Sequence, residues 1–243
     1  MEELIEKNVG DRKLFICLPP SYYQTNQHYP VVYVHDGHYL FSNNLDKLKE
    51  CYQLNEIKEV IIVGMEPVNR LHEYTPWPAE SLTPEYSAFN GEGPLYLAAW
   101  TSIKKYMDKH FRTINDAQAT GMIGASLGGL ISIYALFTSG SNIGKFGFLS
   151  PSLWYKDMLT FIEKTDCVTS EKIIYLYVGA DEGKGKENVQ QSMVPAVKRA
   201  NKMLELKGFS REQLKFKIGE NADHKREFFI EQFMYALAWL YKC

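Results

Sequence analysis

Short apolar runs alternate with longer amphipathic segments along most of this 243-residue chain, and this alternation constrains the fold more than any other feature. Most short runs are rich in β-branched or aromatic residues and end near Gly, Pro or Asp, as buried strands do. The longer segments have the spacing of helices that bury one side. Alternating strands and helices are typical of a mainly parallel sheet with helices on both faces. We therefore predict an α/β fold around a central sheet of about eight strands, and the length suits one domain over residues 1–243.

The expected strands and helices can be placed along the sequence. The strands are expected at residues 13–18, 31–35, 60–64, 119–123, 146–149, 173–178 and 214–218, with a weakly marked one at 4–8. The helices are expected at residues 44–54, 94–110, 127–138, 156–164, 187–207 and 226–241. Pro94 suits a first helical turn and Gly208 a helix end, whereas Pro195 should kink or restart the helix that contains it.

The pentapeptide GASLG at residues 124–128 follows one of the expected strands and fits the pattern G-x-S-x-G. In this pattern the serine lies at a sharp strand-to-helix turn, and the flanking glycines let neighbouring backbone approach closely. The hydroxyl of Ser126 is then exposed at the end of the sheet. The pattern indicates a nucleophilic serine.

A serine hydroxyl needs a histidine to take its proton and a carboxylate to orient that histidine, and in α/β-hydrolases the three follow one another as Ser, Asp or Glu, and His. Of the six histidines, only His224 follows Ser126, so it is the predicted base. The acid is expected after the strand at 173–178, where Glu182 is preferred over Asp181 because it reaches further from the turn. Asp223 is a weaker third choice because it directly precedes the base.

The reaction also needs backbone N–H donors for a developing oxyanion. The sequence predicts them at Leu127, after the nucleophile, and at His38, in the loop that follows an early strand. His35 and His38 could instead suggest a metal site, but no further ligands stand at a recognisable metal spacing, so we expect neither a metal nor an organic cofactor.

Residues 65–93 show no sustained period and contain four prolines, Pro67, Pro76, Pro78 and Pro84. Long loops in compact domains are usually functional or disordered. The aromatic residues Tyr74, Trp77, Tyr86 and Phe89 favour burial, so we expect a folded loop near the mouth of the active site.

Several segments together resemble the putative esterase (esterase D-like) family of α/β-hydrolases, and in particular its enterochelin-esterase-like branch. The matching segments, in order, are residues 30–37 (PVVYVHDG), 70–77 (RLHEYTPW), 124–129 (GASLGG), 149–154 (LSPSLW), 179–182 (GADE) and His224. The resemblance implies an α/β-hydrolase fold with the roles given above for Ser126, His224, His38 and Leu127, and an acid after Gly179.

The same resemblance implies a substrate pocket shaped by Arg70, Glu73 and Trp77, with Ser150, Pro151 and Trp154 lining or supporting it. Plain core packing is the alternative for Trp77 and Trp154. The residues after the base, KREFF at 225–229, depart from relatives that often carry a tryptophan there, which leaves the choice of substrate open.

Composition restricts the partners. The formal net charge of −2 and the mixed signs give no basic face for nucleic acid. The apolar runs are far shorter than the roughly 20 residues that span a bilayer, and the acidic start is unlike a secretory signal. Four scattered cysteines suggest reduced thiols, so we expect a cytoplasmic protein whose partner is a small-molecule ester, as monomer or homodimer.

These features predict a serine-dependent carboxylic ester hydrolase that forms an acyl-enzyme on Ser126. Only one helix is expected between residues 149 and 173, so no large lid is inserted there and the pocket should favour small or protruding acyl esters, siderophore-type lactones included. An acyltransferase on the same fold and an inactive binding module are the two alternatives.

Overall fold

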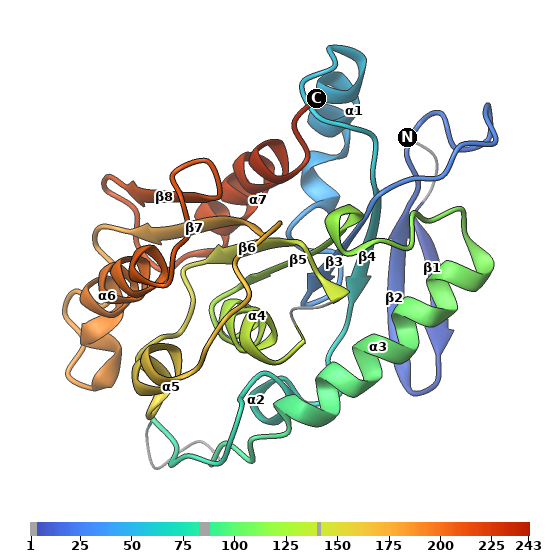
Figure 1. Cartoon of the computed structure of the whole chain (residues 1–243). Coiled ribbons are helices and arrows are strands. Elements are labelled where there is room, and N and C mark those ends of the chain that lie inside the picture. The colour runs from blue at the N-terminus through green and yellow to red at the C-terminus, as the bar shows by residue number, and fades with distance from the viewer. Residues whose placement is uncertain (1–3, 83–87, 140–141) are drawn as a thin grey trace.

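Eight strands form one sheet in the order β1-β2-β4-β3-β5-β6-β7-β8 in the computed structural model, which describes residues 4–82, 88–139 and 142–243 (Figure 1). The strands are β1 (Ile5–Val9), β2 (Arg12–Cys17), β3 (Val31–His35), β4 (Ile61–Met65), β5 (Thr120–Ala125), β6 (Lys145–Leu149), β7 (Ile173–Gly179) and β8 (Leu214–Gly219). Each strand expected from the sequence is present, including the weakly marked first one.

The sheet is parallel from β4 to β8, and only β1 and β2 run antiparallel to their neighbours. All the parallel strands therefore end at the same edge. The chain leaves β3, β5, β7 and β8 at that edge and enters the segments that hold His38, Ser126, Glu182 and His224. This topology brings together residues that are far apart in the sequence.

Helices cover both faces of the sheet (Figure 1). The α-helices are α1 (Leu45–Gln53), α2 (Arg70–Glu73), α3 (Gly93–His110), α4 (Leu127–Thr138), α5 (Met158–Lys164), α6 (Met193–Leu206) and α7 (Arg226–Leu240). Buried residues of α3, α4, α5 and α6 belong to the apolar core on one face, and those of α1 and α7 belong to the core on the other.

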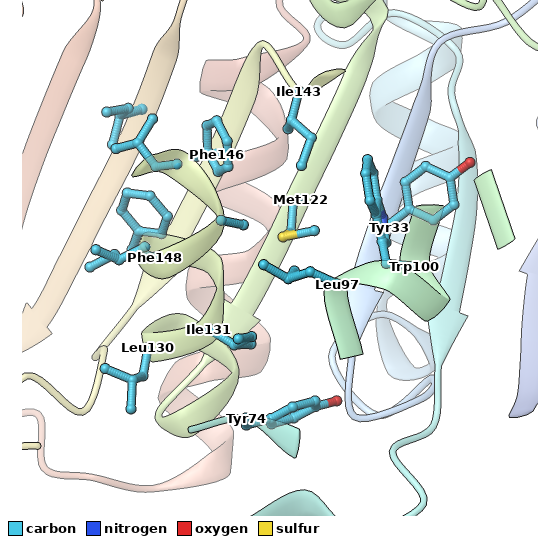
Figure 2. Packing of buried hydrophobic residues seen from close by; sticks show 14 of the residues in the cluster. Tyr33, Tyr74, Leu97, Trp100, Met122, Leu130, Ile131, Ile143, Phe146 and Phe148 are labelled. Carbon is cyan, nitrogen blue, oxygen red and sulfur yellow. The ribbon is translucent and has the colours of Figure 1, made fainter. Parts of the chain in front are cut away.

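The larger core joins α3 and α4 to the middle of the sheet. Figure 2 shows Trp100 of α3 beside Tyr33 of β3, and their rings meet edge to face with centroids 5.4 Å apart. Met122, Phe146 and Phe148 on β5 and β6 are fully buried in the same core. Burial of each large apolar side chain stabilises the fold by about 1.5–3 kcal/mol, and here it fixes β5, the strand that leads into Ser126.

Two details of the helices differ from the simple expectation. The segment expected at 187–207 is a 3-10 turn (Val189–Ser192) followed by α6, so Pro195 lies in the first turn of a restarted helix. The short helix α2 was not expected, because four residues are too few to display a helical period. It lies inside the 65–93 loop, where Tyr74, Trp77 and Phe89 pack into or against the core; Pro84 and Tyr86 lie outside the described residues.

None of the helices in the described parts of the chain combines the length and the apolar character needed to cross a membrane.

Candidate active site

Ser126 lies between the last residue of β5 and the first residue of α4, with φ 57° and ψ −118°. Few non-glycine residues adopt such a backbone conformation, and it persists only where its surroundings impose it. A Cβ at Gly124 would lie 2.4 Å from the carbonyl group of Gly128, so only glycine allows this close crossing of strand and helix. The turn thus has the geometry of a nucleophile elbow.

A hydrogen-bonded chain links Ser126, His224 and Glu182. The Nε2 atom of His224 lies 2.9 Å from the Ser126 hydroxyl, and its Nδ1 atom lies 2.7 Å from Oε2 of Glu182. The His224 side chain is 34% exposed whereas the Glu182 side chain is fully buried. The imidazole can therefore meet a ligand on one side while the carboxylate orients it from the protein interior.

Glu182, not Asp181, is the carboxylate that contacts the histidine. Its other oxygen, Oε1, accepts a hydrogen bond from the backbone N–H of Gly179 at 2.8 Å and another from the hydroxyl of Ser150. Asp181 turns outward, 3.6 Å from Lys184. Asp223 pairs with Lys225 instead. The longer side chain reaches inward from the turn after β7.

The segment after β6 contacts both ends of this chain. Ser150 bonds Glu182, and the Ser152 hydroxyl lies 3.2 Å from that of Ser126. Both serines are almost fully buried, and Ser150 has a φ of 47°. No hydroxyl contacts were predicted for this segment from the sequence, although its position at the carboxyl end of a strand beside the one that leads to Ser126 was a usable signal.

Arg70 of α2 holds the loop that follows β3. Its Nε and Nη2 atoms donate to the two oxygens of Asp36 at 2.7 and 3.0 Å. Although burial disfavours the cation, these hydrogen bonds and the charge of Asp36 raise the pKa of the Arg70 guanidinium. Asp36 and Gly37 both have positive φ, and together they turn the chain back toward Ser126 at His38. The 65–93 loop therefore braces the candidate site through α2.

The backbone N–H groups of His38 and Leu127 make no hydrogen bond to any acceptor among the described residues. Free N–H groups next to a nucleophile are what an oxyanion hole requires. His35, the last residue of β3, lies against Gly124 and Gly128, and its Nδ1 atom is 2.6 Å from the Tyr96 hydroxyl. Burial lowers the pKa of His35 to about 3, with the charge of Arg70 adding to the effect, so the ring is neutral at physiological pH.

A cavity of about 640 Å³ opens over Ser126 and His224. It is lined by Asp36, His38, Tyr39, Glu66, Pro67, Arg70, Ser126, His224, Arg226 and Phe229. Of the six residues expected to shape, line or support the pocket, Arg70 lines this cavity and Glu73, Trp77, Ser150, Pro151 and Trp154 do not. Glu73 is buried in a paired contact with Arg12, Trp77 packs on Tyr155 and Phe161, and Trp154 lines a separate cavity.

In the described part of the chain, no three His, Cys, Asp or Glu side chains are grouped as metal ligands usually are. The chemistry that the site can supply is a proton transfer from the Ser126 hydroxyl to the imidazole of His224, beside the N–H donors of His38 and Leu127.

Comparison with known proteins shows the family to which this chain belongs. The model of the family described as Putative esterase matches residues 7–240. Uncharacterized protein YbbA from Bacillus subtilis (strain 168) is 37% identical over 239 residues, which are 98% of this chain and 96% of YbbA.

Solved structures of other proteins share the fold. An IroE-like serine hydrolase from Shewanella oneidensis has a TM-score of 0.78 and 22% identity, covering 95% of this chain and 76% of its own. The enterobactin esterase FES from Shigella flexneri, crystallised with enterobactin, has a TM-score of 0.76 and 15% identity over 98% of this chain and 58% of its own. The predicted α/β-hydrolase fold is confirmed by this likeness.

Proposed function

The chain belongs to the Putative esterase family and is an ester hydrolase, and from that premise we propose that it is a serine esterase working through an acyl-enzyme on Ser126. One observation carries this proposal, namely the continuous hydrogen-bonded chain from Glu182 through His224 to the Ser126 hydroxyl. Its supporting elements are the free N–H groups of His38 and Leu127.

In the proposed reaction, Ser126 Oγ attacks the ester carbonyl while its proton passes to Nε2 of His224. The oxyanion accepts hydrogen bonds from the N–H groups of His38 and Leu127, and buried Glu182 stabilises the imidazolium. The intermediate collapses by breaking the bond to the alcohol, which takes the proton from His224. Water then repeats the sequence on the acyl-enzyme, releasing the acid and restoring Ser126.

The experiment compares wild type, Ser126→Ala and the control Ser102→Ala with p-nitrophenyl acetate and a fluorophosphonate probe. Ser102 lies on α3, where its hydroxyl bonds the carbonyl of Ala98. We expect the Ser126 variant to lose activity by about 10³-fold or more and to lose labelling, with the control unaffected. Undiminished turnover by Ser126→Ala would exclude the mechanism, and a folded wild type that neither labels nor turns over would favour the binding module.

Among esters, siderophore-type lactones are the first natural class to test, because FES is an enterobactin esterase. The siderophore hydrolase EstA from Aspergillus nidulans also shares the fold, with a TM-score of 0.72 and 15% identity over 97% of this chain and 93% of its own. Mass spectrometry of linearised ferric enterobactin tests this class directly. Partitioning of the acyl group between water and added alcohols tests the acyltransferase alternative. We further propose a cytoplasmic location, in keeping with cysteines that are few and widely separated in the sequence, with no C-x-x-C pair.

A further inference from the structure

Four acidic or basic residues line the cavity over Ser126, namely Asp36, Glu66, Arg70 and Arg226. Their pairing determines which substrate charge the cavity can accept. A charge already bonded to an opposite partner has little attraction left for a ligand, whereas an unpaired one next to the reacting atoms selects substrates.

Asp36 and Arg70 neutralise each other. Two parallel hydrogen bonds of 2.7 and 3.0 Å join them, which is the bidentate geometry that suits a guanidinium and a carboxylate. The Asp36 side chain is only 11% exposed. A substrate would have to break this pair to use either charge.

Glu66 lies along the wall of the cavity beside the loop of Gly37, with Lys13 of β2 nearby. A Cβ at Gly37 would lie 3.1 Å from Cγ of Glu66. The hydrogen bond from Lys13 to Glu6 raises the pKa of Lys13, and the charge of Glu66 adds to this effect. Lys13 is already paired with Glu6 at 2.8 Å, so it offsets only a small part of the Glu66 charge.

Arg226 remains without such a partner. It is the first residue of α7, and its guanidinium lies 5.4 Å from the centre of the Tyr39 ring. Within residues 4–82, 88–139 and 142–243, no carboxylate oxygen lies within 4.0 Å of it. Arg226 does not stabilise α7 either, because a positive charge in the first turn of a helix interacts unfavourably with the helix dipole. An exposed guanidinium that lines the cavity two residues after His224 is therefore free to meet a ligand.

We propose that Arg226 binds an anionic group of the substrate, so that this enzyme prefers esters with a carboxylate or a similar anion on the acyl or the alcohol part. The inference rests on the proposed function and adds the substrate class. Tyr39 would hold the guanidinium by its ring face, leaving the planar fork of N–H donors for the anion.

The test uses two pairs of esters that differ in one charge. The first pair is p-nitrophenyl hydrogen glutarate and p-nitrophenyl pentanoate, and the second is 4-acetoxybenzoate and its methyl ester. The measured quantity is the ratio of kcat/KM for the acidic member to that for the neutral member, in wild type, Arg226→Gln and Arg226→Lys. The matched controls are Lys225→Gln, which removes a neighbouring cation paired with Asp223, and Glu66→Gln, which removes an anion from the cavity wall.

In at least one pair of esters, we expect Arg226→Gln to lower this ratio by about tenfold or more, because a charge-assisted hydrogen bond to the substrate is lost. The ratio for Arg226→Lys should lie between those of wild type and Arg226→Gln. The ratio in wild type should also fall with added salt, since the group is exposed. Lys225→Gln should leave the ratio unchanged, and Glu66→Gln should not lower it. If wild type hydrolyses the esters and Arg226→Gln leaves both ratios unchanged, the inference is wrong. If wild type hydrolyses neither member of either pair nor p-nitrophenyl acetate, the proposed function itself fails.

Discussion

The hydroxyl of Ser152 lies 3.2 Å from the hydroxyl of Ser126, and the backbone N–H of Ser152 donates to the carbonyl oxygen of Ser126 at 3.1 Å. Two residues earlier, Ser150 donates to the buried oxygen of Glu182. One short segment thus contacts both the candidate nucleophile and the candidate acid. Because it is buried and its backbone is held at a positive φ, it can fix the distance between them.

Replacing Ser150 with Ala should lower kcat for p-nitrophenyl acetate by about tenfold to hundredfold, because a hydrogen bond to a charged group contributes about 1.5–3 kcal/mol. Among the described residues, the N–H of Gly179 is then the one hydrogen-bond donor that remains to Oε1 of Glu182. Ser152→Ala is the control from the same segment and should have the smaller effect. A larger loss in Ser152→Ala than in Ser150→Ala, with both variants folded by circular dichroism, would contradict this assignment.

Replacing Glu182 with Gln should reduce kcat by about 10³-fold or more with little change in folding, as expected when the carboxylate that orients a histidine is removed. An amide in this place can donate to Nδ1 of His224, which moves the ring proton to Nε2 and prevents that atom from accepting the proton of Ser126. Asp181→Asn is the matched control, since Asp181 faces Lys184 at the surface. Steady-state kinetics of the two variants show which carboxylate orients His224. A comparable loss of kcat in both variants would contradict the assignment of this role to Glu182.

Arg70 and Asp36 should behave as one unit in a double-mutant cycle. Each single variant, Arg70→Gln or Asp36→Asn, leaves a partly buried group without its partner and should lower both stability and kcat, because the loop that carries His38 loses its brace. The coupling energy should be about 1–2 kcal/mol, below that of a fully buried pair because the Arg70 side chain is 37% exposed. Urea unfolding of the four proteins gives this energy, and additive effects would mean that the two residues act separately.

The sequence was sufficient for the features that depend on local pattern. The short apolar runs that became β3 to β8, most of them rich in β-branched or aromatic residues, and the glycines around Ser126 specify their structure within a few residues, so their places could be predicted. The reach of a glutamate from the turn after β7 also allowed Glu182 to be preferred over Asp181 before its contact with His224 was seen.

Features that depend on contacts between distant parts of the chain could not be predicted from local sequence pattern. The hydroxyl contacts of Ser150 and Ser152 and the pair of Arg70 with Asp36 join segments tens of residues apart, and no local pattern encodes them. Trp77 and Trp154 were expected in the pocket from family resemblance, but an aromatic ring buries equally well in a core, which is where Trp77 packs.

His35 should make the protein less stable as the pH falls below neutrality. Its neutral ring is buried under the turn of Ser126, and burial lowers its pKa from 6.5 to about 3. Between these two values the unfolded chain binds a proton at this position and the folded chain does not, so the stabilisation is complete above pH 6.5 and is lost as the pH falls toward 3.

From pH 7 to pH 5, this one group should lower the free energy of unfolding by about 2 kcal/mol. Urea unfolding at both pH values, on wild type and on His35→Gln, measures the effect. The glutamine does not titrate, so this variant should be less stable at pH 7 because of the altered packing and its changed bond to Tyr96, yet lose less stability between the two pH values. His28→Gln, which changes an exposed histidine, should keep the slope of wild type. Equal slopes in wild type and His35→Gln would assign the acid sensitivity to other groups.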